Sequence, residues 1–212
     1  SFPVVQKGWN LLSLPLRPSN PNYKAVFPNA INKPFLFSNN QYQDEQILKP
    51  GVGYFVKFGD KIDSTQIGSR VSEFRKNFNE VRLFGGWNTV GTPSSRVNVA
   101  DITYELNSGA IETLKNDVYG YTTDRGYTSV SEIVPGLGYW IKVQNEGYYR
   151  AKGSGLPKVI SNSSNEFAGF SSVTVQDADG KSNTLKVSEL NTVNTNRFEL
   201  PPVFASDMFD VR

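Results

Sequence analysis

Residues 8–15 read Gly-Trp-Asn-Leu-Leu-Ser-Leu-Pro, and residues 86–93 read Gly-Trp-Asn-Thr-Val-Gly-Thr-Pro. A second motif follows each of them, Pro-Gly-Val-Gly-Tyr-Phe-Val-Lys-Phe at residues 50–58 and Pro-Gly-Leu-Gly-Tyr-Trp-Ile-Lys-Val at residues 135–143. The tryptophan precedes the first glycine of the second motif by 42 residues in one copy and by 49 in the other. Matched ends with a middle of variable length predict one fold unit used twice.

Each residue type in these motifs has a physical reason to be there. Proline fixes φ at about −65° and glycine accepts positive φ, so Pro-Gly-x-Gly predicts a tight turn leading into a strand. In that strand Tyr54, Val56 and Phe58 share one face, and Phe55 and Lys57 share the other. A tryptophan beside such a turn predicts an indole packed over bare backbone. The residues assigned to the structural motif are Gly8, Trp9, Asn10, Pro15, Pro50, Gly51, Gly53, Tyr54, Gly86, Trp87, Asn88, Pro93, Pro135, Gly136, Gly138, Tyr139 and Trp140.

The rest of the chain indicates an all-β fold. Short apolar runs bounded by Gly, Pro, Asn and Asp are typical of strands, and the clearest are residues 11–16, 54–58, 81–84, 139–143, 171–175 and 184–187. Helical spacing occurs at residues 69–78, where Val71, Phe74 and Phe78 follow one another at intervals of three and four. A helix is one interpretation of this spacing, but a strand or a long connector is favoured.

The domain organisation follows from the repeat. Residues 1–152 are expected to form two pseudo-symmetric β repeats packed on each other, repeat one at about 1–80 and repeat two at about 81–152. Each repeat alone would expose a large aromatic face. Residues 153–166, rich in Gly and Ser, read as a linker. Residues 167–212 are expected to be part of a β-sandwich-like domain, truncated at its end.

Composition excludes several kinds of site. The 212 residues contain no His and no Cys, so zinc sites built on these residues, Ser-His-Asp triads and iron–sulfur clusters are excluded. The 22 basic and 20 acidic residues give a net charge of +2 without a basic cluster, which makes nucleic acid and anionic membranes poor partners. No apolar run is long enough to span a membrane as a helix.

These motifs occur together in a known group of proteins. The Gly-Trp-Asn opening with the Pro-Gly-x-Gly-Tyr closing resembles a repeat of large surface and secreted proteins of Bacteroidota. Residues 177–185, 198–202 and 209–212 resemble the segment that precedes a type IX secretion sorting domain in such proteins. Phe55 departs from the usual Trp, Val203 and Phe204 replace a Pro-rich stretch, and the sorting domain itself is absent. The resemblance implies an extracellular or cell-surface, non-catalytic module. Because residues 208–212 read as an apolar, strand-like run, the natural chain is expected to continue past residue 212.

Aromatic residues are the candidates for ligand binding. The three tryptophans read as core, with a sugar-stacking platform as the alternative. Loops rich in Tyr and Asn suit carbohydrate or protein surfaces, with ordinary strand aromatics as the alternative. The possible ligand-binding residues are Tyr42, Tyr121, Tyr127, Tyr148 and Tyr149.

Three further patterns resemble functional motifs, and each also has a simpler structural interpretation. Asp177 and Asp179 resemble the start of a calcium loop but lack the required Glu, so a hairpin turn is expected there. Asp44 and Glu45 could form a glycosidase pair with Glu105, but the sequence gives no distance between the carboxylates. Residues 63–65 resemble a short O-glycosylation motif, with an exposed turn as the alternative.

We therefore expect a structural or anchoring module without cofactor or metal. Its expected partners are other domains of a larger surface protein or a surface assembly. A glycan-binding or adhesive module is the alternative, and a carboxylate-based glycoside hydrolase is third.

Overall fold

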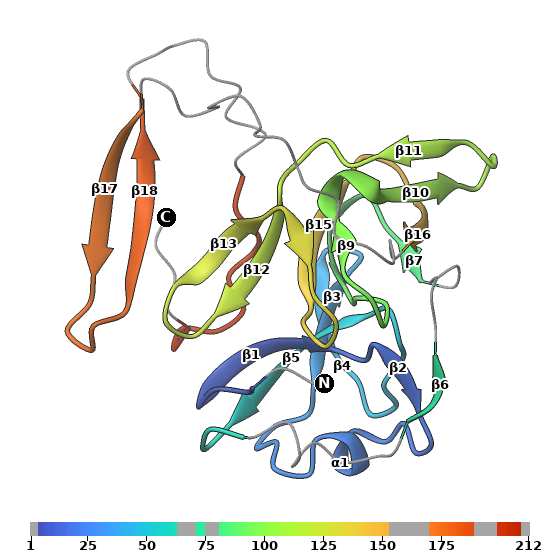
Figure 1. Ribbon diagram of the computed structural model, residues 1–212, viewed down its shortest axis with the longest axis horizontal. Helices are drawn as coiled ribbons and strands as arrows, with labels where there is room; N and C mark the ends of the chain where they lie inside the picture. The colour runs from blue at the N-terminus through green and yellow to red at the C-terminus, as the bar shows by residue number, and fades with distance from the viewer. Residues whose placement is uncertain (1–3, 63–70, 75–80, 153–169, 189–198, 209–212) are drawn as a thin grey trace.

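The computed structural model describes residues 4–62, 71–74, 81–152, 170–188 and 199–208 (Figure 1). These residues form several small antiparallel sheets, with α1 (Tyr23–Val26) as their one short α-helix and η2 (Val99–Asp101) as a 3-10 turn. The predicted all-β class is confirmed. The predicted linker at 153–166 and the glycosylation motif at 63–65 lie outside the described residues.

The first four-stranded sheet contains both motifs of the first copy. Its strands are β1 (Gly8–Ser13), β3 (Phe35–Ser38), β4 (Gln41–Asp44) and β5 (Gly53–Phe58), in the order β1-β5-β3-β4. β1 and β5 pair over their full length, from Gly8 opposite Phe58 to Ser13 opposite Gly53. The two motifs, which are separate in sequence, are therefore neighbouring strands.

The second four-stranded sheet has the same order of strands. Its members are β8 (Gly86–Val90), β12 (Val118–Thr122), β13 (Gly126–Val130) and β15 (Tyr139–Val143), in the order β8-β15-β12-β13. The register of β8 on β15 runs from Gly86 opposite Val143 to Val90 opposite Tyr139. Trp87 is thus opposite Lys142, as Trp9 is opposite Lys57 in the first sheet.

Smaller pairings surround these sheets. A third sheet has the order β11-β10-β16-β7, from β7 (Arg82–Leu83), β10 (Ile102–Leu106), β11 (Ile111–Thr113) and β16 (Gly147–Ala151). Two pairs complete this part, β2 (Leu16–Pro18) with β6 (Val71–Phe74) and β9 (Val97–Asn98) with β14 (Glu132–Ile133).

The helical interpretation of residues 69–78 is wrong where the structure describes them, and the strand alternative holds. Residues 71–74 form β6, which pairs antiparallel with β2. This pairing supplies partners for the backbone groups of an extended segment, so a long-range contact overrides the local helical spacing. The remaining residues of that range lie outside the described part of the chain.

The glycine turns connect the two sheets. A Cβ on Gly53 would lie 2.7 Å from the carbonyl oxygen of Val90, and one on Gly138 would lie 2.9 Å from that of Leu12. Backbone hydrogen bonds bridge the same places: Ser13 N donates to Gly136 O at 2.9 Å, and Gly91 N donates to Gly51 O at 2.7 Å. Each turn therefore docks on the opening strand of the opposite sheet.

This docking changes the role assigned to the glycines. The sequence predicts an indole over the turn, but the closest atoms to Gly53 and Gly138 belong to backbone and side chains of the opposite opening strand. Only a residue without a side chain permits backbones to approach so closely. The tryptophans pack elsewhere, in a cluster shared by the two sheets.

The first and the second four-stranded sheets each have a core on one face, and the third sheet shares the core of the second. The first core contains Leu12, Tyr54 and Val56, and the second contains Val90 and Tyr139. The opposite faces of both sheets meet in a third cluster, which we call the aromatic cluster. Its buried members from the two sheets are Trp9, Leu11, Phe37, Phe55, Trp87, Tyr119, Tyr121, Tyr127 and Trp140, and Met208, which lies outside the sheets, joins them.

A two-stranded hairpin lies to one side of this body (Figure 1). It consists of β17 (Ser171–Gln176) and β18 (Ser182–Val187), and Gly180 has a φ of 83° in its turn. The hairpin turn predicted at 177–180 is confirmed, since Asp177 Oδ1 accepts from the backbone N–H of Asp179 and Lys181. The described residues of 167–212 hold this hairpin and residues 199–208, without the second sheet that a sandwich requires.

Candidate functional site

Residues 199–208 lie against the aromatic cluster and contact both four-stranded sheets. They form no strand. Pro201 and Met208 are buried, and Leu200, Phe204 and Ala205 are partly buried against the cluster. We call residues 199–208 the clasp segment, and the surface of the aromatic cluster that it contacts the aromatic face.

One end of the clasp segment is held by the first sheet. Trp9 Nε1 donates a hydrogen bond to Asp207 Oδ1 at 2.9 Å, and Lys57 Nζ forms an ion pair with Asp207 Oδ2 at 2.5 Å. The ammonium also lies 5.4 Å from the centroid of the Trp9 ring, within cation–π range. A carboxylate, an indole N–H and an ammonium thus meet at one point.

The other end is held in the same way by the second sheet. Trp87 Nε1 donates to Glu199 Oε1 at 3.2 Å, and Lys142 Nζ forms an ion pair with the other oxygen of that carboxylate. Lys142 Nζ lies 5.9 Å from the centroid of the Trp87 ring. Both tryptophan–lysine pairs of the repeated motifs therefore bind an acidic residue of the clasp segment.

Two tyrosines hold the middle of the clasp segment. Tyr42 Oη donates to Pro202 O at 3.1 Å, and Tyr127 Oη donates to the same oxygen at 3.2 Å. Each tyrosine precedes the first glycine of its turn motif by nine residues. Two tyrosines at the same spacing from their turn motifs therefore meet at one carbonyl group.

The two sheets differ beneath Phe204. The ring of Phe204 stacks on Phe55, with centroids 5.1 Å apart and an interplanar angle of 13°. It also meets the edge of Trp9 at 4.6 Å. Trp140, which occupies the position of Phe55 in the second turn motif, packs at 5.1 Å from Phe37 and 6.0 Å from Phe55, and its Nε1 is buried without a hydrogen-bond partner among the described atoms.

The contacts at both ends shift the acidity of the two carboxyl groups. The hydrogen bond from Lys57, followed by that from Trp9, lowers the pKa of Asp207 below its ordinary value. The hydrogen bond from Lys142, with a smaller contribution from Trp87, lowers the pKa of Glu199. Both carboxyl groups are therefore charged at neutral pH, as the ion pairs require.

The motif asparagines close the entry to each opening strand. Asn10 Nδ2 donates to Gln6 O at 2.8 Å and to Gly8 O at 3.0 Å. Asn88 Nδ2 makes the corresponding bonds to Phe84 O at 2.8 Å and to the carbonyl of residue 86 at 3.1 Å. Each side-chain oxygen also accepts the backbone N–H four residues earlier. The asparagine therefore fixes the chain just before the strand.

The motif tyrosines and prolines shape the turns. The backbone N–H of Lys49 donates to Tyr54 Oη, and that of Val134 donates to Tyr139 Oη, both at 2.9 Å. Burial raises the pKa of Tyr139 to about 12 and raises that of Tyr54 as well. The four motif prolines, which begin the turns or follow the opening strands, are half-buried or buried: Pro15, Pro50, Pro93 and Pro135.

The structure places most of the candidate ligand-binding tyrosines inside the fold. Tyr121, Tyr127 and Tyr149 are buried, and Tyr149 Oη donates to the carbonyl of Gly91 at 3.1 Å. Tyr42 is half-buried among rings of the aromatic cluster and Phe204. Of the five, Tyr148 on β16 is the exposed one, with 39% of its surface accessible.

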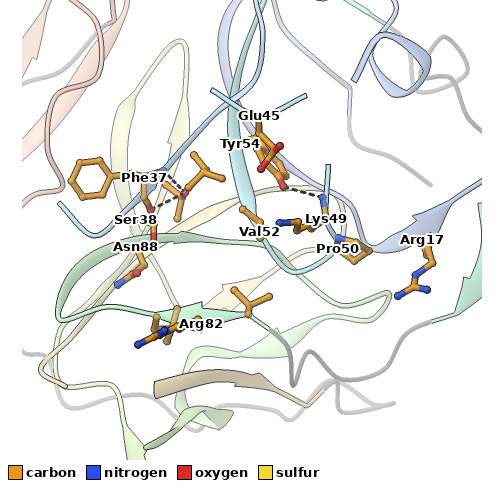
Figure 2. A pocket seen from close by; sticks show the side chains of 14 residues that line it. Arg17, Phe37, Ser38, Glu45, Lys49, Pro50, Val52, Tyr54, Arg82 and Asn88 are labelled. Atoms are coloured by element: carbon orange, nitrogen blue, oxygen red, sulfur yellow. Dashed lines mark hydrogen bonds between the residues drawn. The ribbon is translucent and has the colours of Figure 1, made fainter. Parts of the chain in front are cut away.

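A cavity of about 480 Å³ lies beside the first sheet (Figure 2). Arg17, Lys49, Arg82 and Glu45 border it together with apolar residues. Figure 2 shows the backbone N–H of Lys49 bonded to the Tyr54 hydroxyl in its wall. Arg82 is paired with an acidic side chain and the Glu45 carboxylate accepts backbone N–H groups, so at least two of the four charged groups are engaged in the fold.

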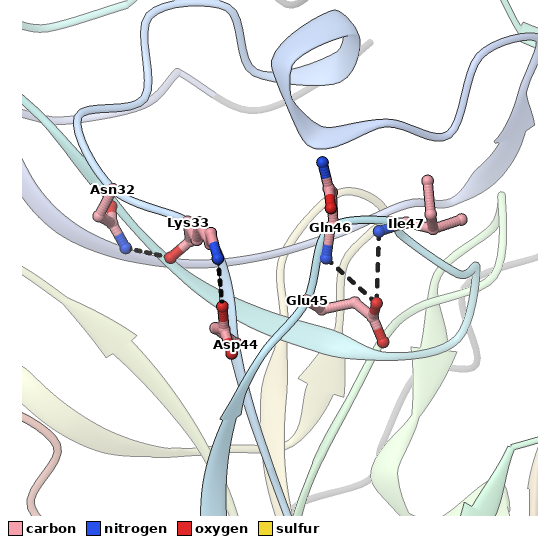
Figure 3. Close-up of polar contacts among 6 residues, drawn as sticks. All are labelled: Asn32, Lys33, Asp44, Glu45, Gln46 and Ile47. Atoms are coloured by element: carbon pink, nitrogen blue, oxygen red, sulfur yellow. Dashed lines mark hydrogen bonds and ion pairs between the residues drawn. The ribbon is translucent and has the colours of Figure 1, made fainter.

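The carboxylates considered for a hydrolase pair have partners of their own. Asp44 forms an ion pair with Lys33 at 2.8 Å, and Glu45 Oε1 accepts from the backbone N–H groups of the next two residues (Figure 3). Glu105 belongs to another sheet and forms an ion pair with Arg150. The Lys33 contact lowers the pKa of Asp44. The three groups thus take part in separate contacts of the fold.

Metal and membrane-spanning sites have no support in the described part of the chain. Among the described residues, no group of three or more His, Cys, Asp or Glu side chains is arranged to hold a metal ion. None of the helices in the same residues is long and apolar enough to cross a membrane.

The clasp segment is the feature that sequence reasoning missed. The sequence places residues 167–212 in a separate β-sandwich-like domain, with no part in the aromatic face. The usable signal is the pair of carboxylates, Glu199 and Asp207, flanking two prolines and Phe204. Each tryptophan–lysine pair offers an N–H and an ammonium to an acidic partner, and this segment supplies two carboxylates.

Comparison with protein-family models, with curated proteins and with solved structures finds no match to this chain.

Proposed function

We propose that this chain is a non-catalytic structural module of a secreted or cell-surface bacterial protein. The observation that carries the proposal is the reciprocal use of the repeated motifs. Each glycine turn docks on the opening strand of the other sheet, and each tryptophan–lysine pair binds one end of the clasp segment. The most distinctive residues of the chain are thus used to hold its parts together.

We infer further that the first and second four-stranded sheets are two copies of one fold unit. Equal strand order and equal register of the opening on the closing strand support this. The contacts of Asn10 and Asn88, and of Tyr54 and Tyr139, match bond for bond. The third sheet, which contributes residues of β10 and β16 to the second core, is an addition to one copy.

The non-catalytic assignment rests on the use of the reactive side chains. The carboxylates that could serve a hydrolase are tied to Lys33, Arg150 and backbone amides. Buried tyrosines with a raised pKa, such as Tyr139 and Tyr149, stay protonated in ordinary buffers. These groups stabilise the fold and are not poised for proton transfer.

The location outside the cell rests on the resemblance of the repeat and the tail to surface proteins of Bacteroidota exported by type IX secretion. The partners of such a module are other domains of a larger surface protein or a surface assembly. Immunodetection on intact cells of the producing bacterium, with and without protease, tests the location. Protease-sensitive signal on intact cells is expected, and a signal confined to the cytoplasmic fraction contradicts the proposal.

A glycan-binding role is the second candidate, and Tyr148 is the observation that favours it. Its exposed ring lies on β16, opposite Glu105 on one neighbouring strand and Arg82 on the other. A glycan array of the wild type beside Tyr148→Ala tests this role. Saturable binding that the variant loses supports a carbohydrate site, and absence of binding leaves the structural role.

A further inference from the structure

The clasp segment is held almost as a bound peptide is held. It joins no sheet, and its Pro202 carbonyl and its side chains make the contacts described above. Among the described residues, the two sheet cores that contain Tyr54 and Tyr139 have no member from this segment. The segment therefore covers one surface of a body that has separate cores of its own.

The chemistry of this contact is that of a recognition site. Phe204 in the middle of the segment and Met208 at its last position pack on the aromatic cluster, whereas the two carboxylates are about half exposed, 53% for Asp207 and 50% for Glu199. An apolar centre with a polar rim is the usual anatomy of a protein interface. Large aromatic anchors such as Phe204 carry much of the energy in such contacts.

The aromatic face also determines the direction of the segment. The two ends of the aromatic face are nearly alike, because each presents a tryptophan–lysine pair to a carboxylate. The centre of the face is asymmetric, because Phe204 stacks on Phe55 and the corresponding position of the other sheet carries Trp140. The larger indole there packs against Phe37 and Trp87 instead. The smaller ring at position 55 therefore selects the side on which Phe204 binds.

We propose that the aromatic face is a peptide-binding site and that residues 199–208 are its ligand, bound within the same chain. The ligand class is a proline-containing segment with a carboxylate near each end and one phenylalanine between them, Glu-Leu-Pro-Pro-Val-Phe-Ala-Ser-Asp in this chain. This site goes beyond the proposed structural role and does not depend on where the protein is located. A tethered ligand has an effective concentration in the millimolar range, so moderate affinity is enough to keep it bound.

The first test separates the segment from the body without removing it. A specific protease site is placed at residues 191–195 of the full chain, and the purified protein is cleaved. We expect the fragment containing residues 199–208 to co-elute with the body, and an excess of synthetic peptide 199–208 to displace it. The same peptide with Phe204→Ala, Glu199→Gln and Asp207→Asn is the matched control and should not displace it.

The second test uses the difference between the two sheets. Phe55→Trp fills the place of Phe204, and we expect about a tenfold or greater loss of peptide affinity in the cleaved protein. Trp140→Phe changes the corresponding position of the second sheet, whose ring lies against Phe55, Tyr42 and Tyr127, and we expect a change of less than about threefold. Circular dichroism of each variant checks that the sheets are intact, so that lost binding is not lost folding.

Three outcomes overturn the proposal. If the cleaved body unfolds when the fragment is displaced, residues 199–208 are part of the core and no ligand. If the control peptide displaces the fragment as well as the wild-type peptide, the carboxylates and Phe204 are not recognised. If light scattering shows that intact chains exchange this segment as dimers at micromolar concentration, the ligand is supplied by a second copy and the assignment to the same chain is wrong.

Discussion

The first and second four-stranded sheets agree at some motif positions and differ at others, and the division is informative. Asparagine, the turn glycines and the turn tyrosine are the same in both, and all three contact backbone. Phe55 and Trp140 differ, as do Leu11 and Thr89, and these residues face the aromatic cluster or the neighbouring sheet. Backbone contacts demand one residue type, whereas side-chain packing accepts several if the neighbours adjust.

The largest expected effect is the loss of an end tryptophan. Trp87→Ala should lower the free energy of unfolding by about 3–5 kcal/mol, because it empties a buried site and frees the Glu199 carboxylate. Trp9→Ala should cost a similar amount, since the Trp9 ring is also buried and its Nε1 donates a hydrogen bond to Asp207. Urea unfolding measures both. A difference of several kcal/mol between the two variants contradicts the equivalence of the ends.

The second largest effect is steric, and it tests whether each glycine turn docks on the opening strand of the opposite sheet. Gly53→Ala and Gly138→Ala place a Cβ 2.7 Å and 2.9 Å from a backbone oxygen, so each should cost about 1–3 kcal/mol. Gly59→Ala is the control, because the nearest atom to its Cβ is a side-chain carbon of Ile31 at 3.9 Å. Thermal unfolding should separate the two turn variants from this control, and equal melting temperatures would count against the docking.

The third largest loss of stability is expected from substitution of the motif asparagines. Asn10→Ala and Asn88→Ala each remove the bonds to the chain before the strand, and each should cost about 1–2 kcal/mol. Asn145→Ala is the control, since its contact with Glu112 is exposed and 3.5 Å long. Denaturant unfolding should give equal losses for the two motif positions; a loss at only one of them breaks the comparison.

Trp140→Phe makes the two sheets alike at their differing position. It removes a buried N–H group without a partner among the described atoms, which offsets part of the lost packing. We expect the free energy of unfolding to change by less than about 1 kcal/mol. Trp87→Phe should cost more, because that indole donates to Glu199. The reverse ranking in urea unfolding contradicts this assignment.

The smallest effect is that of pH on the two ends. The folded pKa values of Glu199 and Asp207 lie below their ordinary values. The stabilisation is therefore complete above the ordinary values, which are about 4, and is lost as the pH falls through the lowered ones. Both groups are about half exposed, so solvent weakens the effect. The stability gap between the wild type and Glu199→Gln/Asp207→Asn should shrink toward about pH 3; a constant gap contradicts the ion pairs.

Local patterns predicted a large part of this fold. The alternation of apolar residues and the flanking Gly and Pro residues predicted the strands around Tyr54 and Tyr139 and the residues that share each face of these strands. An Asp-Gly pair predicted the hairpin turn at Gly180. These features depend on neighbours within a few residues, which the sequence displays directly. The spacing of apolar residues at 69–78 was compatible with a helix or a strand. Residues 71–74 form a strand because they pair with β2.

The candidate site was predicted less well, because its contacts are remote in sequence. Tyr121, Tyr127 and Tyr149 looked like loop residues, and only the packing of two sheets shows that they are buried. The partners of Trp9 and Trp87 lie 198 and 112 residues away. No local spacing encodes such a distance, and the two carboxylates Glu199 and Asp207 are the one sign of it that the sequence displays.

The contact between Trp9 and Asp207 also determines the order in which this chain can mature. At about 5–20 residues per second, a ribosome needs roughly 10–40 s to travel from one of these residues to the other. Until residues 199–208 are synthesised, the surface of the aromatic cluster that they contact, which includes Trp9 and Phe55, lacks this part of its cover. Bare apolar surface on an incomplete chain is a cause of aggregation. We therefore expect the incomplete chain to bind chaperones more strongly than a chain that includes residues 199–208.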